Sequence, residues 1–217
     1  VINTQDELAT TVPHNSLNIR QGTRKYKDIS GPDGKPDGVV DDFDRTVIGN
    51  GNPQFFGGFS NNLSYRNLEF SFLFTYSYGN DVLNADKALF ESAEWYQGGK
   101  VDMLNRWTPS DPQINRQRWG HGYLNEYSNL SSYLVEDGSY LRLKNVQLAY
   151  NFSENLLKRF SLKRLRLYVS AQNLLTLTHY TGYDPEVNFL NSLITPGADL
   201  GAYPRSKIYT FGLNLAF

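Results

Sequence analysis

The sequence predicts an all-β fold of long antiparallel strands. Apolar and polar residues alternate in five segments of the 217-residue chain. A repeat of two residues is the spacing of one face of a β-strand, whereas a helix repeats every 3.6 residues. Each segment spans roughly ten or more residues, longer than the ~5–6 of an average globular strand and close to the ~9–11 of a membrane-spanning one. The connections between the segments alternate between short and long.

The clearest alternation lies in residues 68–78, directly after a similar segment at 55–65. The residues that join the two segments, 65–67, leave room only for a tight turn, so we expect a β-hairpin. The apolar row of the second segment is Leu68, Phe70, Phe72, Phe74, Tyr76 and Tyr78.

Three further strands are predicted, at about 140–152, 164–172 and 209–217. In the first of these, the apolar residues change parity, which predicts a β-bulge near Asn145. The last strand ends its alternating aromatic row at Phe217. A final phenylalanine in such a row is the kind of signal that outer-membrane assembly machinery reads.

Two connections are short, at 65–67 and at 153–162, where we expect a brief amphipathic helix. Three stretches are long, at 22–52, 80–139 and 177–204. Outer-membrane barrels have short periplasmic turns and long extracellular loops, so the long stretches are predicted to lie outside the cell. The apolar rows would then face lipid and the polar rows a wide interior. A soluble β-sandwich also alternates, but its apolar rows must face one another in a dry core.

Composition excludes several classes of protein. The net charge of −1 rules out a strong electrostatic drive toward nucleic acid, and the absence of cysteine excludes disulfides, thiolate metal sites and cysteine nucleophiles. The three histidines, His14, His121 and His179, lack metal-ligand spacing, and no nucleophile elbow or phosphate-binding loop occurs. We therefore expect no enzyme activity. The chain begins at Val1 without a signal peptide, so we expect it to be internal to a longer precursor.

An acidic loop between residues 33 and 44 is the most specific chemical motif. Its carboxylates follow an EF-hand-like spacing around Gly38, and hard oxygen ligands at such offsets suit Ca²⁺. A lysine at the third ligand position and an aspartate at the twelfth depart from that pattern. The alternative is a turn whose carboxylates cap backbone N–H groups. The candidate ligands are Asp33, Asp37, Asp41 and Asp44.

Aromatic residues gather in the long loops. Aromatic faces stack on sugar rings, and neighbouring polar groups can bind hydroxyls or peptide carbonyls, so these residues are candidates for a ligand-binding wall. The alternative is that they pack the loops, and a helix within 85–106 would use some of them as its packing face. The candidates are Trp95, Tyr96, Trp107, Trp119, His179 and Tyr180.

Several motifs resemble one family in its own order. The stretch DGSYLRLKNV at 137–146 resembles a signature near the end of SusC/RagA-type TonB-linked outer-membrane proteins. The stretches LYVSAQNLLT at 167–176 and YTGYDPEV at 180–187 also resemble that family, as do DRTVIG at 44–49 and YGND at 78–81. The resemblance covers nearly all of residues 22–217.

The resemblance implies an outer-membrane barrel of about 22 strands with a plugged lumen in a Gram-negative bacterium. It further implies energy coupling through TonB and its proton-driven inner-membrane partners, a SusD-type surface lipoprotein, and import of glycans or peptides. Residues 1–217 would be the C-terminal part of the barrel, with the plug domain and TonB box outside the chain. The strands here would be stable only with the rest of the barrel and the surrounding lipid. The alternatives are a passive porin or structural barrel without energy coupling, and a soluble carbohydrate-binding β-module.

Overall fold

The protein is described here from a computed structural model. The structure describes residues 1–91, 100–112, 116–118, 130–159, 161–187 and 196–217. The chain forms two compact units. Unit 1 consists of Val1–Gly49 and Leu83–Val135, and unit 2 consists of Asn50–Val82 and Glu136–Phe217.

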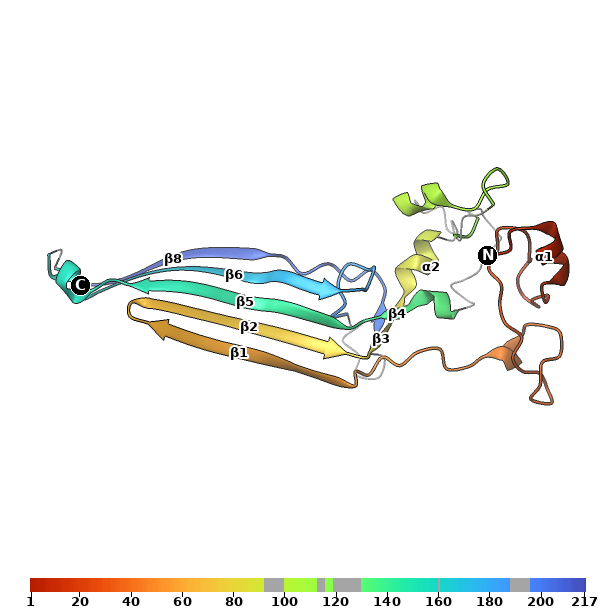
Figure 1. Cartoon of the computed structure of the whole chain (residues 1–217), viewed down its shortest axis with the longest axis horizontal. Coiled ribbons are helices and arrows are strands. Elements are labelled where there is room, and N and C mark those ends of the chain that lie inside the picture. Colours follow the sequence, from red (N-terminus) through yellow and green to blue (C-terminus); the bar gives the residue numbers. More distant parts are fainter. Residues whose placement is uncertain (92–99, 113–115, 119–129, 160, 188–195) are drawn as a thin grey trace. The chain divides into compact units, whose positions relative to one another are not determined.

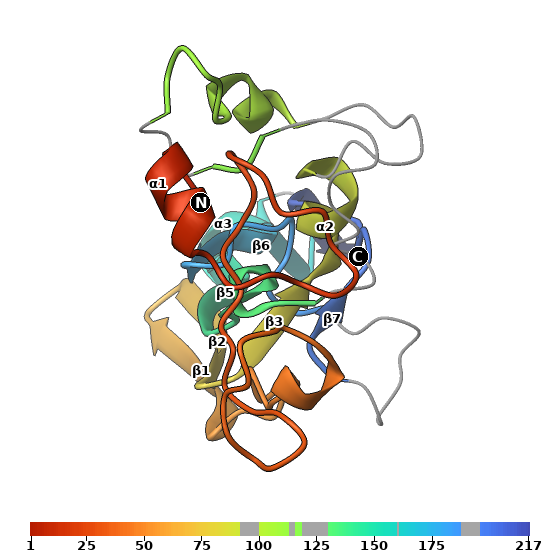
Figure 2. The same cartoon turned by 90° about the vertical axis from the view of Figure 1, so that its right-hand side faces the viewer.

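Unit 2 contains a five-stranded antiparallel sheet in the order β1-β2-β5-β6-β8, seen face-on in Figure 1 and nearly end-on in Figure 2. All five strands that the sequence predicts are present. They run for 9 to 15 residues each, so their length agrees with the prediction as well. The strands are β1 (Phe55–Tyr65), β2 (Leu68–Tyr78), β5 (Tyr140–Asn151), β6 (Arg164–Thr178) and β8 (Ile208–Ala216).

The connections agree with the prediction too. Arg66 has a φ of 53° and forms the tight β1–β2 turn with Asn67. Asn67 Nδ2 also donates to the backbone oxygen of Asn151 at 2.6 Å, which ties this turn to the end of β5. The helix expected between β5 and β6 is α3 (Glu154–Lys158), and Leu157 is its buried residue.

A β-bulge lies one residue from its predicted place. The pairing of β2 with β5 changes from Leu73↔Asn145 to Phe74↔Leu143, which leaves Lys144 without a partner. The pairing of β5 with β6 also shifts register between Leu143 and Asn145. Because the extra residue changes the parity of the strand, the leucines before the bulge and the apolar residues after it share one face.

One face of the sheet, here called the apolar face, is built from cross-strand rows. One row joins Tyr65, Leu68, Tyr150, Leu167 and Leu213, because each residue lies opposite the next in the register. A second row joins Leu63, Phe70, Leu148, Val169 and Phe211. Many of these side chains are exposed, and Phe211 retains 81% of its accessible surface.

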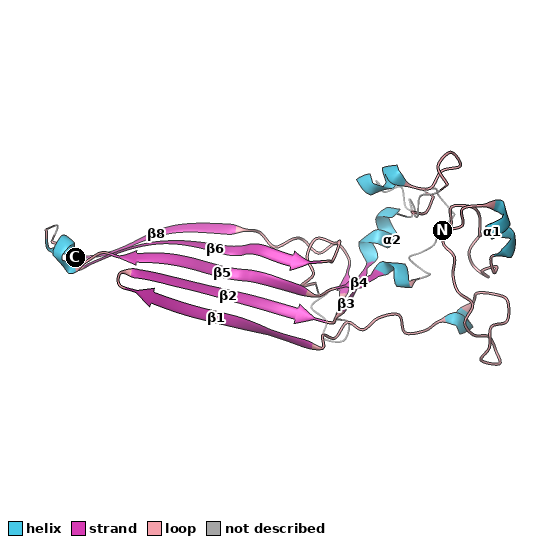
Figure 3. Ribbon diagram, in the orientation of Figure 1, coloured by secondary structure: helices cyan, strands magenta, loops and turns pink. Residues whose placement is uncertain are grey.

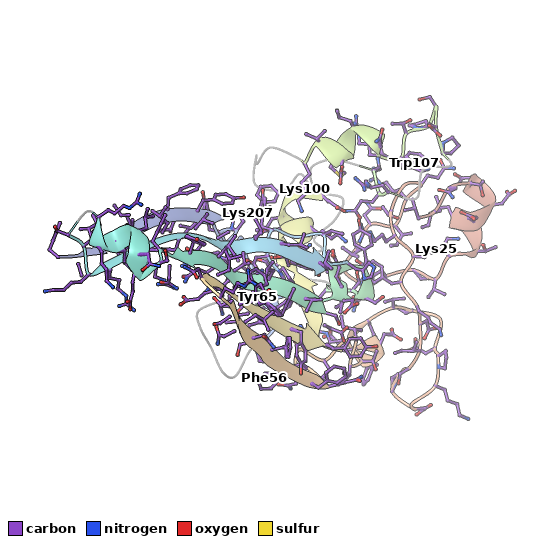
Figure 4. All side chains as sticks on the ribbon, turned by 60° about the vertical axis from the view of Figure 1, so that its left-hand side comes forward. Lys25, Phe56, Tyr65, Lys100, Trp107 and Lys207 are labelled. Carbon is purple, nitrogen blue, oxygen red and sulfur yellow. The ribbon has the colours of Figure 1, made fainter. Side chains whose placement is uncertain are left out.

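The opposite face, here called the polar face, carries the intervening residues. Its rows include Asn62, Ser71, Gln147, Ser170 and Thr210, which lie opposite one another. In the described part of unit 2, the apolar rows are not pressed against each other in a dry core as a sandwich requires. Side chains stand out from both faces in Figure 4, where Phe56 and Tyr65 mark β1.

A small sheet in the order β4-β3-β7 was not predicted from the sequence. Its strands are β3 (Asp81–Asn84), β4 (Val135–Asp137) and β7 (Ala198–Asp199). Strands of two to four residues are too short to show an alternating pattern. The chain passes from unit 2 to unit 1 within β3 and returns within β4.

Unit 1 contains short helices, drawn in cyan in Figure 3. The α-helices are α1 (Gln5–Thr10) and α2 (Ala85–Glu91), and the 3₁₀ helices are η1 (Asp42–Asp44), η3 (Val101–Asn105) and η4 (Ser132–Leu134). Within the stretch 85–106, where a helix is expected from the sequence, the structure describes α2 and η3, and residues 92–99 lie outside the described residues. The buried apolar residues of unit 1 include Ile2, Ala88, Met103 and Leu134. None of the described helices is long and apolar enough to cross a membrane.

A glycine on the polar face is required by its aromatic neighbour. Gly212 lies opposite Tyr168 in the β6–β8 register, and a Cβ at this position would overlap the Tyr168 ring. An aromatic ring that covers a cross-strand glycine compensates for the missing side chain. The pair therefore fills its space with one large and one absent side chain.

We predict that Gly212→Val impairs folding of the full-length protein by overpacking, at a cost of about 1–3 kcal/mol. Tyr168→Ala in the same chain should restore much of the loss, because it removes the ring that the valine would meet. The fraction of folded protein can be followed by the gel-mobility change of unheated samples. An unimpaired Gly212→Val single variant would contradict the packing described here.

Candidate functional site

A buried arginine lies at the centre of an ion-pair network in unit 2. Arg142 of β5 is 2% exposed, and it stands on the polar face between Thr75 and Thr176 in the register. Its Nη2 donates to Asp184 Oδ1 at 2.6 Å and its Nη1 to Glu186 Oε2 at 3.1 Å. Its Nε donates to Thr176 Oγ1 at 3.1 Å. A buried guanidinium needs such partners, because an unpaired charge away from water is costly.

A second arginine closes the network. Arg205, just before β8, places Nη2 at 3.3 Å from Glu186 Oε1 and Nε at 3.7 Å from Asp184 Oδ2. Asp184 Oδ1 also accepts the backbone N–H of Glu186 at 2.9 Å. The network therefore connects β5 with the chain just after β6 and the chain just before β8. We call these four residues, Arg142, Asp184, Glu186 and Arg205, the loop clasp, because they hold both ends of the long stretch 177–204.

Two further contacts hold the same stretch. The hydroxyl of Tyr180 donates to Asp199 Oδ2 at 2.5 Å, and both residues are buried. Asp199 Oδ1 accepts the backbone N–H of Ala202 at 3.0 Å. In addition, the Glu136 carboxylate accepts hydrogen bonds from the backbone N–H and the hydroxyl of Thr181, each at 2.8 Å. The base of this loop is thus a hydrogen-bonded structure rather than an open turn.

The clasp brings residues of two separate sequence motifs into contact. The stretch 137–146 supplies Arg142, and the stretch 180–187 supplies Tyr180, Asp184 and Glu186. The motifs are far apart in the sequence but meet because β5 and β6 are antiparallel neighbours. Alternation alone does not show this contact, because it assigns a face but no partner outside the sheet.

Unit 1 has a buried charged cluster of its own. Arg24 Nη2 donates to Glu91 Oε2 at 3.4 Å, and the Tyr133 hydroxyl donates to the same oxygen at 2.7 Å. The Arg24 guanidinium lies 3.0 Å from the centre of the Tyr133 ring. Burial and the bond to Glu91 raise the pKa of Tyr133 to about 12, so its hydroxyl stays protonated at neutral pH. The cluster joins the N-terminal segment, α2 and η4.

Three of the four acidic candidates accept hydrogen bonds from backbone N–H groups. Asp44 accepts from Ile29 at 2.6 Å, from Ser30 at 3.0 Å and from Asp41 at 2.8 Å. Asp41 accepts from Phe43 and Asp37 from Val39, whereas Asp33 is exposed in the turn. The loop containing η1 is drawn in orange in Figure 2. These bonds lower the pKa of Asp44.

The structure describes all of residues 28–44, and these bonds match the N–H-capping alternative. Among the described residues, no group of three or more histidine, aspartate or glutamate side chains could hold a metal ion. Calcium binding by Asp33, Asp37, Asp41 and Asp44 stays a prediction, which calorimetric titration of the full-length protein with Ca²⁺ would test.

The aromatic candidates are in different surroundings. Trp107 is buried and packs over Gly22, where a Cβ would lie 2.6 Å from its ring. Tyr180 is buried on Asp199, whereas its neighbour His179 is exposed. The other candidates, Trp95, Tyr96 and Trp119, lie outside the described residues. A ligand-binding role for these residues stays a prediction.

Sequence reasoning missed two residues of the polar face. Phe56 of β1 lies opposite Ser77, which in turn lies opposite Tyr140. Phe56 is 75% exposed, so it offers an aromatic surface on the polar face. Arg142 was the other omission, although its position between two leucines of β5 gives a signal for the polar face. Phe56 directly follows Phe55, and two adjacent phenylalanines break the alternation that would otherwise assign each ring to one face of the strand.

Comparisons with known proteins give one consistent picture. A TonB-dependent receptor of Formosa agariphila is 36% identical over 211 residues, which are 92% of this chain and 20% of that protein. The TonB-dependent receptor SusC of Bacteroides thetaiotaomicron is 25% identical over 207 residues, 88% of this chain and 19% of SusC. The chain therefore spans about a fifth of the length of these curated relatives. No family model matches the chain.

Solved structures agree with the sequence relatives. The RagAB peptide transporter has a chain that matches with a TM-score of 0.63 and 30% identity, over 77% of this chain and 17% of that one. The RagAB peptide importer in its closed-closed state matches with a TM-score of 0.67 and 29% identity, over 86% of this chain and 20% of that one.

Removal of the central charge of the loop clasp should free the loop. Arg142→Met leaves Asp184 and Glu186 without their main partner, and loss of one member of a buried pair costs about 3–5 kcal/mol. Arg205→Met should cost about 0–1 kcal/mol, because the Arg205 side chain is 43% exposed. Hydrogen exchange of residues 177–205 in the full-length protein measures the difference. Equal protection in the two variants would rule out a central role for Arg142.

The acidic loop should loosen in acid. Because the folded pKa of Asp44 is lowered, its stabilising effect is present above the unfolded value of about 3.9 and is lost as pH falls through the folded pKa. Hydrogen exchange at Ile29, Ser30 and Asp41, corrected for intrinsic rates, should accelerate over that range. Asp44→Asn should show faster exchange already at pH 7 and little further dependence on pH. A pH-independent wild type would contradict this role of the carboxylate.

Proposed function

Because this chain belongs to the TonB-dependent receptors of the SusC/RagA type, we propose that it forms part of an outer-membrane β-barrel through which a nutrient is actively imported. The observation that carries the proposal is the apolar face of the five-stranded sheet. Its aromatic and aliphatic rows run across neighbouring strands and are exposed. An exposed apolar surface of that extent is unfavourable in water and favourable in hydrocarbon.

The edges of the sheet support a larger barrel. β1 and β8 each have one neighbour in the sheet order. Unpaired backbone groups at an edge are costly within lipid, so each edge strand needs another neighbour there. The remainder of the same barrel is the partner that we propose for both edges. Recovery of residues 1–217 alone as a soluble monomer that unfolds cooperatively would refute this dependence.

The polar face would then line the lumen, with the long loops at its extracellular mouth. Phe56 adds an aromatic surface to that face, and the loop clasp fixes the base of the stretch 177–204. We propose that the transported molecule, a glycan or a peptide, contacts this end of the lumen and the stretch 80–139. RagAB is a peptide transporter, and a peptide or a sugar presents groups that aromatic and polar side chains can bind.

A SusD-like surface lipoprotein and TonB complete the proposal. The solved relative is a two-component assembly by its name, RagAB, which supports a partner at the extracellular mouth. The curated relatives are TonB-dependent, which supports coupling to the proton-driven complex of the inner membrane. TonB contact would fall to parts of the barrel outside this chain, such as the plug.

Uptake by cells that carry the full-length protein tests the energy coupling. We expect uptake of labelled glycan or peptide mixtures to require the protein and to stop when TonB is deleted or the proton gradient is dissipated. Uptake that survives both treatments would support a passive porin instead. A lipoprotein that co-purifies with the protein, and the ligand retained in that complex, would identify the partner and the class of substrate.

The lipid-facing assignment makes a separate prediction for adjacent residues of β8. Phe211→Arg places a charge in lipid toward the periplasmic end of β8, so it should lower the free energy of unfolding, by less than the about 2–4 kcal/mol of a site at the bilayer centre. Thr210→Arg places the same charge on the polar face and should be tolerated. Denaturant unfolding of the full-length protein in vesicles measures both. A larger loss for Thr210→Arg would reverse the assigned faces.

A further inference from the structure

An open groove lies on the apolar face toward the short-turn end of the sheet. It has a volume of about 590 Å³ and is formed by β2, β5, β6 and β8. Its lining includes Leu148, Tyr150, Leu167, Val169 and Phe211. A concave apolar surface of this size is within the range of small-molecule sites, which extends over about 300–1,000 Å³.

A group of basic residues lies just beyond the same end of these strands. The turn that connects β5 and β6 carries Lys158, Arg159 and Lys163, all exposed, against a single acidic residue, Glu154. None of the three basic side chains makes an ion pair within the described part of the chain. We call them the basic turn. Positive charge that forms no ion pair among the described residues, on a short turn, is available to an external anion.

The basic turn is anchored and close to the groove. Leu157 of α3 is buried, and its backbone oxygen accepts the N–H of Leu162 at 3.1 Å. The backbone N–H of Lys163 donates to the backbone oxygen of Ala216 at 2.8 Å, so Lys163 lies beside the last residue of β8. Leu167, at the near end of the groove, is four residues from Lys163. At about 3.3 Å per residue, the groove and this lysine of the basic turn are on the order of 13 Å apart.

We propose that the groove and the basic turn together bind one anionic phospholipid of the periplasmic leaflet. An acyl chain would occupy the groove, and the phosphate-containing headgroup would bind the basic turn. The short turns of outer-membrane barrels face the periplasm, so both parts lie at the depth of that leaflet. Basic residues at a membrane surface attract anionic headgroups, and Tyr150 has the amphipathic ring that is typical of the interface.

Charge complementarity selects this occupant over others. A neutral lipid would use the groove but leave the basic turn without a partner. A free phosphate would use the turn but leave the groove empty. The inference rests on the lipid-facing assignment proposed above, and the Phe211→Arg and Thr210→Arg pair tests that assignment separately. The experiment below measures lipid binding and not import. Its outcome therefore does not depend on whether the protein is an active importer or a passive porin.

Native mass spectrometry of the full-length protein in detergent tests the headgroup. The probes are dioleoyl phosphatidylglycerol and dioleoyl phosphatidylcholine, which share acyl chains and differ in charge. We expect tighter binding of phosphatidylglycerol. The Lys158→Gln, Arg159→Gln, Lys163→Gln variant should lose that preference, with affinity falling about fivefold for each neutralised residue.

A matched control replaces three exposed lysines elsewhere in the chain: Lys27→Gln, Lys35→Gln and Lys207→Gln. This variant should keep the preference for phosphatidylglycerol. Lys207, just before β8, is labelled in Figure 4. Val169→Phe should fill the groove and weaken binding of phosphatidylglycerol, whereas Leu177→Phe on the same strand should not. Gel mobility of unheated samples confirms that each variant is folded. Equal binding of the two lipids by the wild type, unchanged binding in the basic-turn variant, or an equal loss in the control would overturn the proposal.

Discussion

Antiparallel hydrogen bonding between neighbouring strands is the constraint on which the rest of unit 2 depends. Once β2, β5 and β6 pair in one register, each side chain is assigned to a face and to a cross-strand row. A shift of one residue would exchange the two faces and place Glu69 and Arg142 among the phenylalanines. The bulge at Lys144 shows how strongly the register is maintained, because one extra residue is accommodated so that the leucines before it stay on the apolar face.

The same register creates the loop clasp. Arg142 belongs to the polar face only because of its place in β5, and its partners Asp184 and Glu186 follow β6 within a few residues. The sheet therefore positions a buried charge, and that charge positions the base of a loop. Exposed loops are costly to order without such anchors, since each fixed residue loses conformational entropy. The buried Tyr180–Asp199 pair holds the same loop by a hydrogen bond.

The two faces of one sheet carry different tasks in the proposed transporter. The apolar face would meet lipid, and its groove beside the basic turn would bind a single lipid molecule. The polar face would meet the transported molecule, with Phe56 and the loop base near the mouth. Because successive residues of a strand point to opposite faces, these surfaces are independent in substitution experiments, and neighbours such as Thr210 and Phe211 report on different environments.

The sequence by itself determined the strands, their faces, the β1–β2 turn, α3 and the bulge, because a two-residue period is a local property that neighbouring residues display directly. The motif resemblance indicated the family, which the relatives then supported. Only the tertiary structure decided that Tyr180 is buried on Asp199, that Arg142 meets Asp184, and that Asp44 caps three backbone N–H groups. It also decided the short strands β3, β4 and β7. These features depend on partners distant in the chain, and no local pattern of apolar and polar residues encodes the identity of such a partner.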